Sequence, residues 1–174
     1  TVDSLGIRLE MVDAVARRLA QKVGLPRDHL AVTFSHSHTT PKVNGASDTI
    51  FSTPIPAEHQ EHIDTYTAQL TDWIEQVALQ AIADRRPSQL AWNVGQVGFA
   101  VNRRTAGGPV DHDLPTLVVR DLDSNIRAIY VTYACHCVTL SHNKISGDWA
   151  GYGARLKQLR EWLQQSSRSR EPPR

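Results

Sequence analysis

Residues 126–137 form a run that is apolar on both of the faces a β-strand would present. Successive side chains of a strand point to opposite faces, so residues two apart share a face. One face carries Ile126, Ala128 and Tyr130, and the other carries Ile129, Val131 and Tyr133. A strand of this kind needs cover on both sides, which predicts a central strand in a layered protein.

Helical periodicity occurs in three other segments. Apolar residues at helical spacing begin at Leu9 and end at Gly24, which predicts a first helix. Proline suits the first turn of a helix, so a second, longer helix is expected to begin near Pro56, and a third is expected over 150–164. The expected buried stripe of the second helix is Ile63, Leu70, Ile74, Val77 and Ala81, with Tyr66 and Trp73 beside it.

Further strand-like runs cover 30–34, 89–101 and 116–121, whereas 42–53 is rich in turn residues and predicts a loop. Helices alternate with strands at first, and strands then follow one another. This order favours an α/β fold, a layered sandwich in which helices flank a mixed β-sheet that is incomplete. We expect one partial domain over 1–165 and a disordered polar tail over 166–174.

The composition excludes some classes of function. Lys and Arg number 19 against 18 for Asp and Glu, and a net charge of +1 is too small to attract the chain to nucleic acid or to a membrane surface. No apolar run approaches the roughly 20 residues of a transmembrane helix, and the first residues lack the basic start and apolar core of a signal peptide. Two cysteines, Cys135 and Cys137, flank His136. They are expected to be buried thiols, because a disulfide between residues so close would be strained.

Neither the cellular compartment nor the oligomeric state follows from the composition or from the cysteines.

His36 and His38 stand two apart after the strand-like run 30–34. On a strand this spacing places both imidazoles on one face, where they can approach one metal ion. Neutral imidazole is a common zinc ligand. A pair of histidines in a hydroxyl-rich loop is also often simply solvated, and the pair alone does not decide between these interpretations.

His136 follows the most apolar run of the chain, where a histidine is unusual. A polar loop and then Gly147-Asp148 at a helix start come after it, which is a typical place for an active site in α/β proteins. His136 can instead be a core histidine with its hydrogen bonds satisfied, and Asp148 can instead cap the helix. Together with His36 and His38, His136 predicts a metal cluster but not a reaction.

Asn102 and Arg103 close the strand-like run 89–101. The planar guanidinium of arginine suits a carboxylate or a developing oxyanion. A solvated charge at the end of a strand explains Arg103 equally well from the sequence alone.

Four segments, in order, resemble the neutral, non-lysosomal ceramidases. VTFSHSHTTP is similar to the family's "THTHSGP" segment, and VNRR is similar to its "NRS" segment. PVDHDLPTLVVRDLDSNIRAIYVTYACHCVTL resembles the stretch that leads to the family's second metal histidine, and NKISGDWAGYGARL resembles the segment after it. The resemblance spans roughly residues 5–160, as judged from these motifs.

The resemblance implies a zinc (Zn²⁺) amidase that hydrolyses N-acylsphingosine-like substrates, small-molecule or lipid amides. It implies that His36 and His136 are zinc ligands and that His38 and Arg103 are catalytic. Asn102 and Asp148 are expected to contact substrate. The family's remaining zinc ligands, a Glu and a Tyr, and its reactive Ser lie further along, so we expect this chain to be a fragment that is inactive by itself. A secreted or periplasmic location would fit the family.

The sequence also departs from the family pattern. Lys42 and Val43 stand where the family is rich in glycine, Cys137 follows the second histidine in place of Gly or Pro, and Trp149 replaces the Asn of "GDN". These changes alter the expected pocket rim, which leaves the lipid substrate open. Two alternatives stay open as well: a metal-dependent hydrolase of another amide or an ester, and an inactive remnant or binding module.

Overall fold

The computed structural model describes residues 1–50, 53–140 and 143–155. It divides into two compact units. Unit 1 combines Thr1–Asp84 with the segment that begins at Cys137, and unit 2 contains Arg85–His136. The predicted tail, 166–174, and the boundary at 165 lie outside the described residues and stay predictions.

Unit 1 holds the helices α1 (Leu9–Val23), α2 (Ala57–Ala83) and α3 (Asp148–Arg155), with short 3₁₀ turns at Arg27–His29 and Asp48–Ile50. The predicted first two helices are confirmed. Gly24 ends α1 in the left-handed conformation (φ 66°), which glycine adopts without steric cost, and its N–H donates to the carbonyl of Ala20. The third helix begins at Asp148, and its predicted extension to 164 lies outside the described residues.

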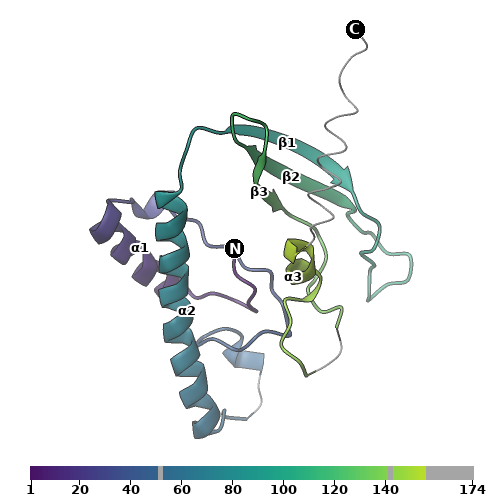
Figure 1. Ribbon diagram of the computed structural model, residues 1–174. Helices are drawn as coiled ribbons and strands as arrows, with labels where there is room; N and C mark the ends of the chain where they lie inside the picture. Colours follow the sequence, from purple (N-terminus) through teal and green to yellow (C-terminus); the bar gives the residue numbers. More distant parts are fainter. Residues whose placement is uncertain (51–52, 141–142, 156–174) are drawn as a thin grey trace. The chain divides into compact units, whose positions relative to one another are not determined.

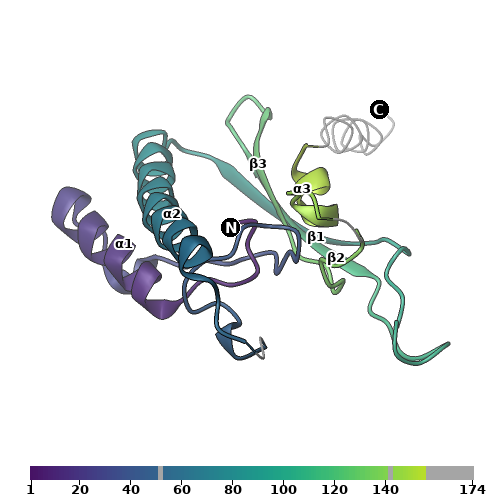
Figure 2. The same cartoon turned by 90° about the horizontal axis from the view of Figure 1, so that it is seen from below.

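Helices α1 and α2 lie side by side in both views (Figures 1 and 2). Their buried residues contribute to a core that extends to the loop between them. The core cluster consists of Met11, Val43, Ala46 and Leu70, with Val2, Ile7, Tyr66 and Ile74 packed against it. Val43 and Ala46 of this core belong to the loop that precedes α2. The core therefore holds in place the segment that follows His36 and His38.

The predicted buried stripe of α2 is wrong toward the C-terminal end of the helix. Leu70 is buried as expected and Ile74 packs against the core, but Val77 is 64% exposed and Ala81 is exposed as well. Glu75 takes the buried position, with 6% of the residue exposed, and forms ion pairs with Arg18 and Lys22 of α1. Apolar spacing cannot reveal a helix face on which a buried carboxylate is neutralised by a neighbouring helix.

Unit 2 contains an antiparallel sheet of β1 (Gln89–Gln96), β2 (Asp113–Arg120) and β3 (Ile126–Val131), in the order β1-β2-β3. The α/β class is confirmed, and the sheet is open. All pairings in this sheet are antiparallel rather than mixed. A parallel bridge between Val2 and Phe34, in unit 1, is what the described residues show of the strand predicted over 30–34.

The prediction that 126–137 is a central strand is also wrong. β2 is central, whereas β3 is an edge strand that ends at Val131. The tight connection explains the order, because Asp121 accepts hydrogen bonds from the backbone of Asp123 and Asn125 and turns the chain straight back beside β2. β1 is likewise shorter than predicted and ends at Gln96. None of the described helices combines the length and apolarity needed to cross a bilayer.

Candidate metal centre

His36 lies in a loop rather than at the end of a regular strand. Its backbone is left-handed (φ 57°), which is uncommon for a residue with a side chain. The parallel bridge anchors the loop just before it: Val2 N–H donates to Thr33 O over 2.9 Å, and Ser35 N–H donates to Val2 O over 3.1 Å. The turn at His36 brings its ring to 5.1 Å from that of His38, centroid to centroid, with the ring planes at 88°. The two imidazoles therefore meet through a loop turn and not through strand alternation.

One hydrogen bond selects the tautomer of His36. Its Nδ1 lies 2.7 Å from the carbonyl oxygen of Leu5. A carbonyl oxygen only accepts, so Nδ1 carries the proton of the neutral ring and the lone pair lies on Nε2. A histidine that donates one ring N–H to a backbone carbonyl and offers the other nitrogen is the usual arrangement of a metal-ligating imidazole.

The loop that carries His38 is bonded to two segments from the far end of the chain. His38 N–H donates to Cys137 O over 3.1 Å, and Ser146 N–H donates to Thr39 O over 2.8 Å. The Thr39 hydroxyl donates to Ser146 O over 2.7 Å, and the fully buried Ser37 donates to the same carbonyl over 3.2 Å. All of these groups belong to unit 1. They fix the backbone on which His38 stands.

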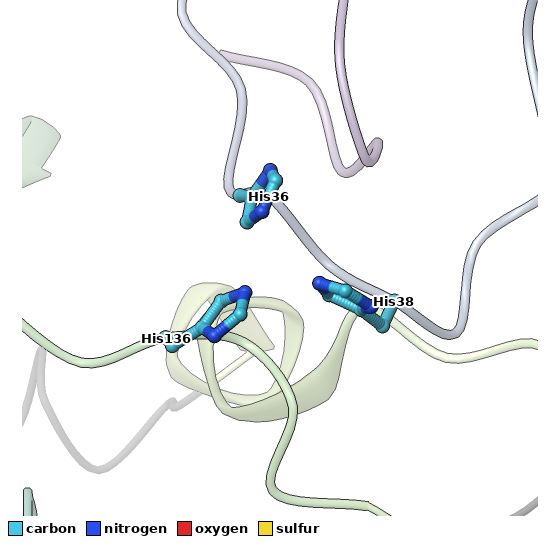
Figure 3. A group of neighbouring side chains, drawn as sticks. All are labelled: His36, His38 and His136. Carbon is cyan, nitrogen blue, oxygen red and sulfur yellow. The ribbon is translucent and has the colours of Figure 1, made fainter. Parts of the chain in front are cut away.

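His136 joins this framework through the peptide bond to Cys137, the residue whose carbonyl accepts from His38. Each of His36, His38 and His136 offers one ring nitrogen, and these nitrogens all lie within 4.8 Å of one another. Figure 3 shows the three rings around a common space. The histidines that the sequence predicts to gather are thus brought together, although His136 reaches the cluster from a loop and not from a strand end.

The donor set suits zinc. Neutral imidazole is a preferred zinc ligand, and nitrogens around a tetrahedral zinc ion lie about 3.3 Å apart, given Zn–N distances near 2.0–2.1 Å. The three ring nitrogens lie within 4.8 Å of one another, so they would have to approach more closely to reach that geometry. All three side chains are exposed. Three imidazoles leave a coordination position for a further ligand.

Asp148 is buried and its backbone is left-handed (φ 54°). One carboxylate oxygen accepts from the Thr139 hydroxyl (2.6 Å) and the Trp149 N–H (2.7 Å). The other oxygen accepts from the N–H groups of Thr139 (3.0 Å) and Leu140 (3.1 Å). Burial raises the pKa of Asp148, but the hydrogen bonds from Thr139, Trp149 and Leu140 outweigh it and hold the pKa below its ordinary value. The geometry favours a structural role, and substrate contact stays a prediction.

Asn102 and Arg103 belong to unit 2, beyond the end of β1. The Asn102 side-chain oxygen accepts from the N–H groups of Arg104 (3.1 Å) and Thr105 (3.0 Å), and its amide nitrogen donates to Pro109 O (3.2 Å). Asn102 therefore organises the loop that carries Arg103, whose side chain is exposed. Oxyanion binding by Arg103 and substrate binding by Asn102 stay predictions.

The sequence gives no signal for several groups that build the centre. The carbonyl of Leu5 and the carbonyl of Ser146 are backbone atoms, and any residue could supply them. Thr139 carries a hydroxyl three residues after His136, but nothing in the local pattern marks it as a partner of Asp148.

No family model matches the sequence, and no curated protein matches it. Among solved structures, the chain is similar to the crystal structure of a neutral ceramidase from Pseudomonas aeruginosa. The likeness covers 86% of this chain and 26% of that chain, with a TM-score of 0.60 and 18% sequence identity. The chain has the fold of part of a neutral ceramidase. It spans about a quarter of that enzyme's length, and at this identity the relationship to the ceramidase is a distant one of fold.

Proposed function

We propose that this chain carries part of the active site of a zinc-dependent hydrolase of N-acyl amide bonds, of the ceramidase type. The observation that carries the proposal is the convergence of the ring nitrogens of His36, His38 and His136 within 4.8 Å. The fold shared with part of a neutral ceramidase supports it, as do the sequence motifs that resemble that family.

In this proposal His36 and His136 hold the metal, His36 through Nε2 because Nδ1 donates to Leu5. A zinc ion supplies a Lewis acid that polarises an amide carbonyl and lowers the pKa of a nearby water. His38 stands beside both rings, where it can complete the ligand set or move a proton from the attacking water to the departing amine nitrogen. The carbon–nitrogen bond then breaks to give a carboxylate and an amine, and Arg103 steadies the oxyanion that forms on the way.

The proposal extends beyond these residues. By the resemblance, a Glu, a Tyr and a Ser outside the 174 residues complete the site. We therefore expect weak zinc binding and background turnover from this chain alone, because groups that act as one catalytic unit fail together when some are missing.

Zinc titration of metal-free protein by calorimetry tests the metal site. Losing a hydrogen-bond partner of a metal ligand typically weakens metal binding about 10–100-fold. His36→Ala and His136→Ala each remove a ligand itself and should weaken zinc binding by more than this. His62→Ala is the matched control, since His62 is an exposed histidine of α2 outside the cluster. Binding that is equally weakened by all three substitutions, or by none, would contradict the proposed site.

Turnover distinguishes the reaction. A longer protein that contains this chain should hydrolyse N-acylsphingosine or short N-acyl amides, and a chelator should abolish that activity. Faster hydrolysis of esters would instead support a different metal-dependent hydrolase. Metal binding without turnover on any of these substrates would support an inactive remnant or binding module.

A further inference from the structure

We propose that Asp148 is a positioning residue that fixes the segment after His136, and through it the place where the His136 imidazole joins His36 and His38. This inference rests on the proposed function, because it assigns a role toward that same metal site. It replaces direct substrate contact with an action through the backbone.

The contacts of Asp148 exceed what a helix cap requires. An N-cap side chain accepts from the backbone N–H of the second or third residue of its helix, whereas the bond from the α3 backbone to Asp148 comes from Trp149, the very next residue. The three other donors are the hydroxyl and N–H of Thr139 and the N–H of Leu140. These donors follow His136 closely along the chain. Most of the carboxylate's hydrogen-bonding capacity is therefore directed at the loop of His136.

The same loop is bonded to the backbone of His38. Cys137, between His136 and the segment that Asp148 holds, is fully buried and accepts the His38 N–H. Ser146 ties the start of α3 to the same place, since its hydroxyl accepts the Asp148 N–H and its carbonyl accepts from Thr39. Asp148 thus stands at the junction of the two loops that carry His38 and His136.

The left-handed backbone of Asp148 indicates that the hydrogen bonds of its carboxylate offset the strain of its conformation. A left-handed backbone is comfortable for glycine, and burial of a carboxylate opposes its ionisation. An aspartate in this position bears both costs, which a surrounding network of four donors must offset. Glycine would remove the backbone strain and keep none of the bonds to Thr139 and Leu140.

Cobalt(II) and zinc titrations of the full chain give the first test. Asp148→Gly should weaken metal binding about 10–100-fold, the range that loss of a group orienting a ligand costs, and should change the visible spectrum of bound cobalt. Asp148→Asn and Thr139→Val, which keep part of the network, should fall between wild type and Asp148→Gly. Glu75→Gln is the matched control: it also neutralises a buried carboxylate of unit 1, between α1 and α2, and should leave metal affinity and spectrum unchanged.

Hydrogen exchange without metal gives a second, independent test. The His38 amide donates to the carbonyl of Cys137 rather than to the Asp148 carboxylate. Relative to the core amides of α1 in the same variant, exchange of the His38 amide should accelerate at least tenfold in Asp148→Gly and measurably in Thr139→Val, whereas Glu75→Gln should leave this ratio unchanged. If the wild type binds neither metal, the proposed function fails and the His38 amide still decides the role of Asp148. Unchanged His38 exchange, or metal binding that responds equally to Glu75→Gln, would reduce Asp148 to a local cap and overturn the proposal.

Discussion

The Nδ1 atom of His36 lies 2.7 Å from the carbonyl oxygen of Leu5. Since the carbonyl can only accept, this contact assigns the proton to Nδ1 and the lone pair to Nε2. Nitrogen NMR of labelled protein should therefore find neutral His36 as the Nδ1–H tautomer. Added zinc should shift the Nε2 resonance and leave Nδ1 protonated. A ring protonated at Nε2, or a zinc-induced shift at Nδ1, would show that the Leu5 contact does not orient this histidine.

Leu70 and Val77 stand on the same helix, but Leu70 is 7% exposed and Val77 is 64% exposed. Leu70→Ala should destabilise the fold by about 2–5 kcal/mol, because it leaves a cavity among Met11, Val43 and Ala46. Val77→Ala should change the unfolding free energy by no more than about 0.5 kcal/mol, as is usual at an exposed site. Denaturant unfolding of both variants measures the difference. If both variants lost comparable unfolding free energy, the result would support the buried stripe that the apolar spacing of α2 predicts.

Glu75 provides a pH-dependent contribution to stability. The hydrogen bond from Lys22 lowers the pKa of Glu75, burial raises it, and the hydrogen bond from Arg18 lowers it, with a net shift below the ordinary 4.5. Because the pKa of Glu75 is lower in the folded than in the unfolded state, its ionised carboxylate stabilises the fold at any pH above the unfolded-state pKa. This stabilisation is lost as the pH falls through the folded-state pKa. Glu75→Gln should therefore be less stable than wild type at neutral pH, and the gap should narrow progressively below about pH 4.5.

Thermal melts between pH 7 and pH 3 measure the difference in stability between wild type and Glu75→Gln. Glu61→Gln is the control, since Glu61 is an exposed carboxylate of the same helix. Its difference from wild type should stay nearly constant across the range. A gap for Glu75→Gln that stays constant or widens as the pH falls would contradict the ion pairs with Arg18 and Lys22.

The sequence predicts most reliably what depends on neighbours in the chain. Helix α1 follows from the spacing of Leu9–Val23 and the glycine after it, and both helix ends involve only adjacent residues. The place of β3 at the edge of the sheet does not follow, because apolar side chains on both faces indicate strand propensity but not which strand lies alongside. The buried Glu75 escapes prediction for a related reason, since its partners come from another helix.

For the metal centre, the identities of His36, His38 and His136 could be predicted, but the means of assembly could not. The sequence predicts that alternation along strands brings the rings together, whereas they meet through a left-handed turn at His36 and a loop at His136. The supports are backbone carbonyls and a buried carboxylate, among them the oxygens of Leu5 and Cys137. Such groups carry no signature in a single sequence, because any residue type can supply a carbonyl.

One face of the sheet in unit 2 leads to a last prediction, about association. The register places Trp92, Leu117 and Tyr130 in one row, and Leu90 and Val94 flank Trp92 on the same face. Leu90 is 68% exposed and Trp92 is 62% exposed, on the edge strand β1. Contiguous exposed apolar groups beside an open strand edge favour association. The isolated chain should therefore self-associate as its concentration rises, as seen by light scattering.

Trp92→Lys should suppress this association, because it places a hydrated charge in the centre of the apolar row. Asn93→Lys is the matched control: it adds the same charge to the next residue of β1, which is also exposed but points to the opposite face of the sheet. A general effect of net charge would suppress association equally in both variants, whereas an effect of the apolar row would appear in Trp92→Lys alone. A wild-type chain that stays monomeric at high concentration would show that this face does not drive association.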